Sequence, residues 1–184
     1  MPTKTGYSIA GGGGKGYINV GGWNTTLTDK ATTQAEVPGT TRREGANIYF
    51  YGLQGTLSIE GKNSFVMMIA PATDGNGTLI SPVVLSNAPA GTANPYLVNG
   101  MTIQTMSAGV YGWYFKEGIA TVTMGADSGG ATVGSPITPA TGTVGVFATA
   151  DATGVGWALT AMLADASGLA YVTFAGRARG QSVF

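Results

Sequence analysis

Three acidic pentapeptides are the stretches of this sequence whose residue types could do chemistry. They read ADSGG around Asp127, ADATG around Asp151 and ADASG around Asp165. An Asp side chain in such a stretch can accept the backbone N–H two residues further on, and the Gly that follows adopts positive φ without a steric cost. A calcium loop needs about four or five oxygen ligands within about twelve residues, a density that none of the three stretches has. We therefore predict three turns between strands and no metal site.

The other reactive side chains do not form a catalytic set. The chain contains no Cys and no His, which excludes Cys nucleophiles, Ser-His pairs and most zinc, copper and iron sites. Glu60 and Glu117 each have a Gly and a Lys close by but no acid-base partner nearby in the sequence. GGGGKG at 11–16 resembles a phosphate-binding loop, but no Ser or Thr follows Lys15. The sequence predicts a protein that is not an enzyme, with no catalytic residues and no cofactor.

The charge of the chain argues against two classes of partner. Nine basic and nine acidic residues give a net charge of zero over 184 residues. Nucleic acids and anionic membranes attract proteins with a basic face, and the basic pairs Arg42-Arg43 and Arg177/Arg179 are typical of solvated ends. No signal-peptide core and no apolar run of about 20 residues is present. We expect synthesis in a cytoplasm and neither a nucleic-acid nor a membrane partner.

The N-terminal quarter differs in composition from the remainder. Residues 1–46 are rich in Gly and poor in large apolar side chains, so they cannot bury enough surface to offset their own ordering entropy. We predict an extended N-terminal arm that orders against another subunit; a floppy tail is the alternative. A short helix over Asp29–Glu36, ending before Pro38, is compatible with the pattern.

The sequence pattern of residues 47–184 is typical of a β domain. FVMMIA at 65–70 is short and wholly apolar, as in a strand buried on both faces, and DGNG then predicts a hairpin with 78–85. From 111 to 176, short β-like runs alternate with Gly breaks, for example at 111–118 and 119–125. ALTAMLADA at 158–166 contains helix formers, but its short length and the preceding Gly156 favour a strand. The predicted fold class is all-β: a small β-barrel or sandwich meander with the extended Gly-rich arm.

Large apolar side chains in the arm and in one uncharged stretch are candidates for partner contacts. Residues 75–115 contain no charged residue, and exposed apolar surface usually marks a contact with a partner. The same stretch can instead be core. YGWYF at 111–115 fits a buried core, a subunit contact or a sugar-stacking platform. The predicted partner-binding residues are Tyr7, Ile9, Tyr17, Ile18, Trp23, Tyr111 and Trp113.

Three short segments between 109 and 176 follow one another in a recognisable order. They are Val133, Gly134, Ser135, Pro136, Ile137 and Thr138; then Gly156, Ala158 and Leu159; then Gly168, Leu169 and Val172. In this order they resemble the small β-barrel decoration (cement) proteins of tailed-bacteriophage heads. The resemblance implies a trimeric, non-enzymatic virion subunit that binds the major capsid protein on the outer head lattice and stabilises it. It also implies that the arm reaches neighbouring subunits.

Two other functions remain open on the sequence. A phage tail-tube subunit or another virion β-protein also uses β-structure and protruding arms, and it would assemble into rings or tubes. A carbohydrate-binding or adhesin module would use Trp113 and its neighbours to stack on a sugar. The low charge fits the virion functions, because many copies can then pack without self-repulsion.

Overall fold

The computed structural model describes residues 23, 25–55, 64–68, 72–73, 79–81, 84–86, 98–125, 130–140, 146–149 and 154–174. Every regular element among these residues is a β-strand, which confirms the all-β prediction. The helix expected over Asp29–Glu36 is wrong. This stretch is not helical. Instead, Ala31 and Tyr111 exchange two backbone hydrogen bonds, of 3.2 and 2.8 Å, which attach the stretch to the large sheet.

Twelve strands are defined. Their bounds are β1 Thr41–Glu44, β2 Asn47–Gln54, β3 Phe65–Met68, β4 Ala72–Thr73, β5 Leu79–Ser81, β6 Val84–Ser86, β7 Val98–Thr102, β8 Tyr111–Thr123, β9 Pro136–Pro139, β10 Phe147–Thr149, β11 Gly156–Ala158 and β12 Ser167–Thr173. Ten of them form one sheet in the order β1-β2-β6-β3-β7-β8-β12-β11-β9-β10, and β4 pairs with β5. Among the described residues, all pairings between these strands are antiparallel except that of β2 with β6.

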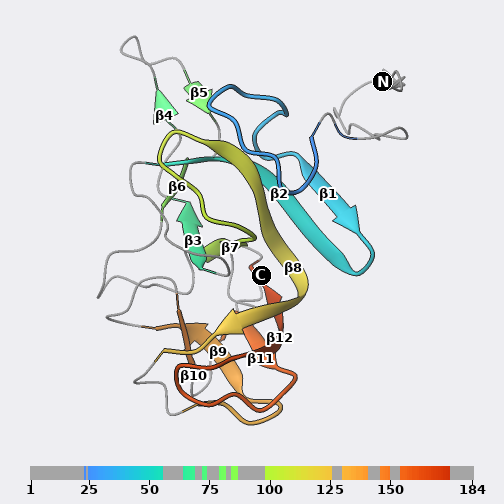
Figure 1. Ribbon diagram of the computed structural model, residues 1–184, viewed down its shortest axis with the longest axis vertical. Helices are drawn as coiled ribbons and strands as arrows, with labels where there is room; N and C mark the ends of the chain where they lie inside the picture. Colours follow the sequence, from blue (N-terminus) through green and yellow to red (C-terminus); the bar gives the residue numbers. More distant parts are fainter. Residues whose placement is uncertain are drawn as a thin grey trace, which may run out of the picture.

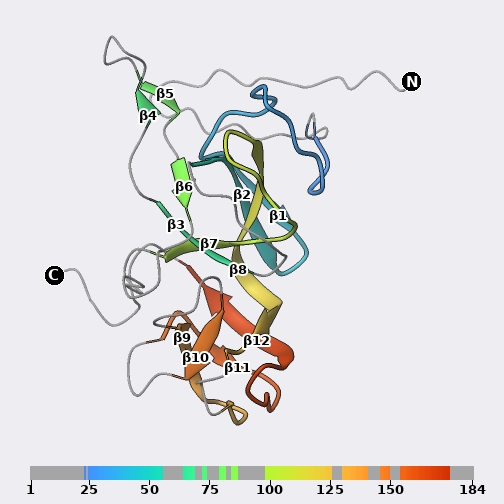
Figure 2. The same cartoon turned by 60° about the vertical axis from the view of Figure 1, so that its left-hand side comes forward.

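The large sheet is open, so the predicted barrel is not formed. Its outermost strands, β1 and β10, do not pair with each other among the described residues. An additional pairing of β2 with β8 makes the first part of the sheet fold back on itself. Figures 1 and 2 show the result: β1 to β7 lie in the upper part, β9 to β12 lie in the lower part, and β8 runs through both.

A glycine in the middle of β8 allows this strand to serve both parts. The sequence predicted separate runs at 111–118 and 119–125, whereas the structure has one strand of 13 residues. Gly118 has φ +127°, and a Cβ there would lie 2.2 Å from Asn47 Oδ1. The same Oδ1 accepts the Ile119 N–H at 3.0 Å. Residues 111–117 pair with β2 and residues 117–123 pair with β12, so the two partner strands meet next to Gly118.

The predicted hairpin between 65–70 and 78–85 is confirmed in its strand pairing. Met67 lies opposite Ser86 in β3 and β6, and Ala72 lies opposite Ser81 in β4 and β5. Phe65 and Val66 are both buried. Since successive residues of a strand point to opposite faces, this part of β3 is covered on both sides, as its apolar run predicts.

The main core lies on the inner face of the sheet and is rich in aromatic rings. Phe115 and Phe147 each contact Phe174, with ring centroids 6.4 and 6.3 Å apart. A second, smaller cluster contains Phe50 stacked on Tyr114 at 5.4 Å. Edge-to-face and offset rings at these separations add to the stabilisation that burial itself provides. The two clusters fix β8 between β2 and β12.

Candidate functional site: the anchor of the N-terminal segment

Trp113 is the centre of a polar and aromatic cluster on the upper part of the sheet. It is fully buried on β8, directly opposite Tyr51 of β2. The two rings meet edge to face at 5.3 Å, and Tyr111 stacks on Tyr51 at 6.1 Å. The cross-strand register therefore places three large rings together, and such pairs are a main source of sheet stability.

The N-terminal segment covers the outer side of this Trp113 ring. Trp23 packs its ring against Trp113 at 5.2 Å and an interplanar angle of 78°. The Arg42 guanidinium lies 5.9 Å from the Trp23 centroid and 5.7 Å from the Trp113 centroid, within the range of a cation–π contact. The Arg42 cation thus contacts two rings that are 90 positions apart in the sequence.

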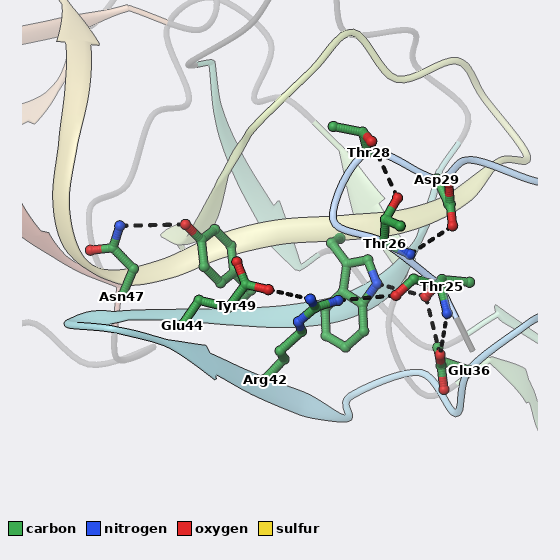
Figure 3. Close-up of polar contacts among 10 residues, drawn as sticks. Thr25, Thr26, Thr28, Asp29, Glu36, Arg42, Glu44, Asn47 and Tyr49 are labelled. Carbon is green, nitrogen blue, oxygen red and sulfur yellow. Dashed lines mark hydrogen bonds and ion pairs between the residues drawn. The ribbon is translucent and has the colours of Figure 1, made fainter. Parts of the chain in front are cut away.

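Thr25 connects these rings to the backbone through a chain of hydrogen bonds (Figure 3). Its hydroxyl accepts the Trp113 Nε1–H at 2.9 Å and donates to Glu36 Oε1 at 3.1 Å. The Thr25 N–H donates to the same Glu36 oxygen at 3.0 Å, and Arg42 donates to the Thr25 carbonyl at 3.0 Å. Arg42 also forms an ion pair with Glu44.

A further contact fixes the end of this segment. The Tyr51 hydroxyl accepts the Ala35 N–H at 3.3 Å, and burial raises the pKa of the Tyr51 phenol. Lys30 donates to the Thr105 carbonyl at 3.0 Å. We call the group Trp23, Thr25, Glu36, Arg42, Tyr51 and Trp113 the anchor. Glu36 accepts two hydrogen bonds from Thr25, and Arg42 pairs with Glu44, so the chemistry of the anchor is that of attachment.

The structure brings together three of the seven predicted contact residues. Trp23 and Tyr111 are half-buried, and Trp113 is completely buried. A partner can reach the Trp113 ring only if Trp23 and Arg42 first move away from it. Tyr7, Ile9, Tyr17 and Ile18 lie outside the described residues, and their partner contacts stay predictions.

Sequence reasoning missed the polar half of the anchor. Arg42 was expected to be a solvated end, but its side chain is only 16% exposed. Neither Thr25 nor Glu36 was among the predicted partner-binding residues. The one available signal was the pair of aromatic runs at 49–51 and 111–115, which pair as neighbouring strands and attract a cation to their outer edge. Part of the predicted arm, residues 41–44, forms β1, so the described portion of the arm packs on the sheet.

The acidic turns can be assessed at Asp165, since Asp127 and Asp151 lie outside the described residues. A turn is present, closed by the Ala166 N–H donating to the Leu163 carbonyl at 3.1 Å. Its positive φ, +57°, belongs to Asp165 itself and not to Gly168. Gly168 is required for another reason, because a Cβ there would lie 2.1 Å from Met162 Cγ. No cluster of three or more possible metal ligands occurs in the part of the chain that the structure describes.

Comparisons with protein families and with curated proteins give no match. Over the described residues, no helix has the length and apolarity needed to cross a membrane. The resemblance to decoration proteins therefore rests on the chain's own three segments. These occupy the turn before β9 and β9 itself, β11 with the residue after it, and β12.

Proposed function

We propose that this protein is a structural subunit of a tailed-bacteriophage virion, namely a decoration protein that binds the major capsid protein on the outer head lattice and stabilises it. It acts without catalysis, metal or cofactor, as a homotrimer on the virion surface after synthesis in the bacterial cytoplasm. The family that the three segments resemble has a small β-barrel, whereas the sheet of this chain is open.

The observation that carries the proposal is the meeting of the three resembling segments at one point. Gly156 of β11 lies opposite Ile137 of β9 on one side and opposite Val172 of β12 on the other. A Cβ at Gly156 would lie 2.2 Å from the Tyr171 carbonyl oxygen and 2.7 Å from Val172 Cα. Close packing at this point therefore requires glycine, and one residue from each segment supplies the surroundings. A pattern that is dispersed in the sequence is thus a single packing unit.

The anchor supports a second part of the proposal, the role of the arm. Residues 1–22 begin beside Trp23, which the Trp113 ring and Arg42 attach to the sheet. Twenty-two residues span at most about 70–80 Å when extended, enough to reach beyond the copy to which they belong. We propose that Tyr7, Ile9, Tyr17 and Ile18 contact the capsid or a neighbouring subunit. Individually weak contacts of this kind become strong when many copies bind one lattice.

Peptide mass spectrometry on purified virions of the phage that encodes this chain, with heads and tails separated, tests the proposal. A copy number near that of the major shell protein, in the head fraction, is the expected result. Recovery with the tails would instead support the tail-tube function, and absence from both fractions would refute a virion role.

A binding experiment tests the arm separately. A variant lacking residues 2–22 retains the anchor, so it should stay folded and lose its binding to capsids. The matched control is Arg43→Ala, which lies in β1 beside the anchor and leaves the arm intact. Full capsid binding by the shortened chain would refute the role of the arm. The adhesin alternative requires glycan binding that is lost on substitution of Trp113, whose ring is covered in the described chain.

A further inference from the structure

A row of aromatic and apolar side chains crosses the lower part of the sheet on its solvent side. Trp157 of β11 lies opposite both Tyr171 of β12 and Pro136 of β9, and Tyr171 lies opposite Ile119 of β8. Trp157 and Ile119 are 43% and 46% exposed, and Tyr171 and Pro136 are half-buried. These strands lie in the lower part of Figures 1 and 2, away from the anchor. We call the solvent side of the four strands the Trp157 face.

The other side of the same strands is buried, which holds the Trp157 face in place. Ala158, Ala170 and Val122 alternate with the residues of the row and belong to the main core. The strand that carries Trp157 is paired on both of its edges. The row is therefore built on a paired sheet and not on a loop, so a ligand that binds it does not have to order the chain first.

Polar side chains flank the row on both sides. Glu117 and Thr121 both lie on β8, two positions before and two positions after the residue that this strand contributes to the row. The Glu117 carboxylate accepts the Tyr171 hydroxyl at 3.1 Å, which places it beside the row. Thr121 is exposed, and the hydroxyls of Thr123 and Ser167 lie further along the same face, 3.3 Å apart. The Trp157 face thus combines aromatic rings with hydroxyl groups and one carboxylate.

The size and the charge of the Trp157 face argue against a macromolecular partner. Four strands about 4.8 Å apart and about six residues long cover about 300 Å², well below the roughly 800 Å² per partner of a standard stable protein interface. Within 117–123, 136–139, 156–158 and 167–173, Glu117 is the one charged residue. These strands therefore offer no cation to the phosphates of a nucleic acid or of a lipid headgroup.

A neutral sugar combines the same two kinds of surface. The C–H groups on the face of a sugar ring are apolar, and they stack on the electron-rich face of a Trp or Tyr ring. The sugar hydroxyls donate to carboxylates and exchange hydrogen bonds with Thr side chains. We propose that the Trp157 face binds a neutral oligosaccharide, which stacks on Trp157 and Tyr171 and forms hydrogen bonds with Glu117 and Thr121. Leu169, 45% exposed opposite Thr121, adds an apolar contact beside the stacked ring.

This sugar site is separate from the adhesin alternative, which places the sugar on Trp113. The Trp113 ring is buried and covered by Trp23 and Arg42, whereas Trp157 is accessible without any rearrangement of the chain. The inference adds a ligand to the proposed virion subunit and does not rest on where that subunit binds. Its tests use purified protein without capsids, so its failure leaves the capsid proposal standing.

The first experiment measures binding of the full chain to soluble oligomers of glucose, mannose and N-acetylglucosamine by titration calorimetry. The wild type should bind at least one of these probes, and Trp157→Ala should weaken that binding by about tenfold or more, since single aromatic anchors dominate small contact surfaces. The matched control is Leu163→Ala, at a position 78% exposed on a turn outside the Trp157 face, and it should bind like the wild type. A wild type that binds none of the probes, or undiminished binding by Trp157→Ala, overturns the proposal.

The second experiment follows the stacked ring and a flanking hydroxyl. A bound sugar excludes water from Trp157, so the tryptophan emission should move to shorter wavelength when the probe is added, and this change should be absent in Trp157→Phe. Thr121→Val removes the hydroxyl, keeps the shape of the side chain and should weaken binding by about two- to tenfold. Thr33→Val, at an exposed position of the N-terminal segment, is its control and should bind normally. Equal binding by the two Thr variants contradicts the assignment of Thr121.

Two outcomes would assign the Trp157 face or the sugar differently. Trp23→Ala uncovers Trp113 and leaves the Trp157 face intact, so sugar binding should not change. Binding that rises in Trp23→Ala and persists in Trp157→Ala would support the adhesin alternative and overturn this proposal. Self-association that Trp157→Ala abolishes, in a chain that binds no sugar, would show that a second copy covers the face, and the sugar site would again be refuted.

Discussion

Replacement of Trp23 by Ala should detach the N-terminal segment from the sheet without disturbing the main core. The substitution removes the ring that lies edge-on to Trp113 at 5.2 Å and one of the two rings under Arg42. An edge-to-face aromatic pair contributes about 0.5–1.5 kcal/mol beyond its burial, and a cation–π contact at a partly exposed site contributes about 0.5–1 kcal/mol. We expect the free energy of unfolding to fall by about 2 kcal/mol, the sum of these two contributions.

Urea unfolding followed by circular dichroism measures this loss, and tryptophan emission reports where it arises. The emission experiment uses a Trp157→Phe background, because Trp157 is 43% exposed and would mask the buried ring. Without Trp23, water reaches Trp113 and its emission should move to longer wavelength. A loss of about 2 kcal/mol corresponds to a fall in Tm of about 4–8 °C for a chain of this size.

Two controls separate the anchor from general destabilisation. Arg43→Ala, next to Arg42 on β1, removes a side chain that donates to the Gly45 carbonyl at 3.3 Å and should cost less than about 0.5 kcal/mol. Combining Trp23→Ala with Arg42→Ala should give a coupling free energy of about 0.5–1 kcal/mol. An unchanged Trp113 emission, or strict additivity of the two substitutions, would refute the assignment of these residues to one anchor.

Three further predictions concern the packing and titration of buried groups. Gly156→Ala should lower the free energy of unfolding by about 3 kcal/mol, because its Cβ would lie 2.2 Å from a backbone oxygen that cannot move freely; a thermal unfolding curve like that of the wild type would contradict this. Thr173→Val should raise stability by about 1 kcal/mol in urea unfolding, since the buried Thr173 hydroxyl has no hydrogen-bond partner within the described structure; a loss of stability would mean that the hydroxyl is paired. Burial raises the pKa of the Tyr114 phenol, so the folded chain keeps this proton where the unfolded chain loses it. The contribution of Tyr114 to stability should therefore be fully present below a pH of about 10 and should be lost above it by up to about 1.4 kcal/mol per pH unit; urea unfolding at several alkaline pH values should show a shallower fall in Tyr114→Phe, and equal slopes would be the contrary result.

The sequence alone determined the fold class and much of the local structure. Short β-branched and aromatic runs between glycines specify strands through local sterics and side-chain periodicity, which need no knowledge of distant residues. The same holds for the hairpin of β3 to β6 and for the turn at Asp165. The virion function remains an inference from three short segments. Their meeting at Gly156 was not visible in the sequence, because it depends on the order of β9, β11 and β12 in the sheet.

Closure of the sheet and the position of the arm depended on long-range pairing. Whether β1 meets β10 is decided by how far the whole sheet curls, which no local pattern encodes. Likewise, the Arg42 side chain is largely buried because its guanidinium lies over the rings of Trp23 and Trp113, which are distant from each other in the sequence. The identity of the anchor residues could therefore not be obtained from spacing.

Two of the three Gly-Trp pairs show most directly what only the tertiary structure decided. Trp113 and Trp157 each follow a glycine inside a short β-like run, and their local sequences give no reason to distinguish them. Trp113 is fully buried because β2 and the segment around Thr25 lie against it, whereas Trp157 is 43% exposed on the outer face of β11. Strand periodicity places side chains on alternate faces, but which face receives a covering layer is set by the neighbours that the fold brings to it.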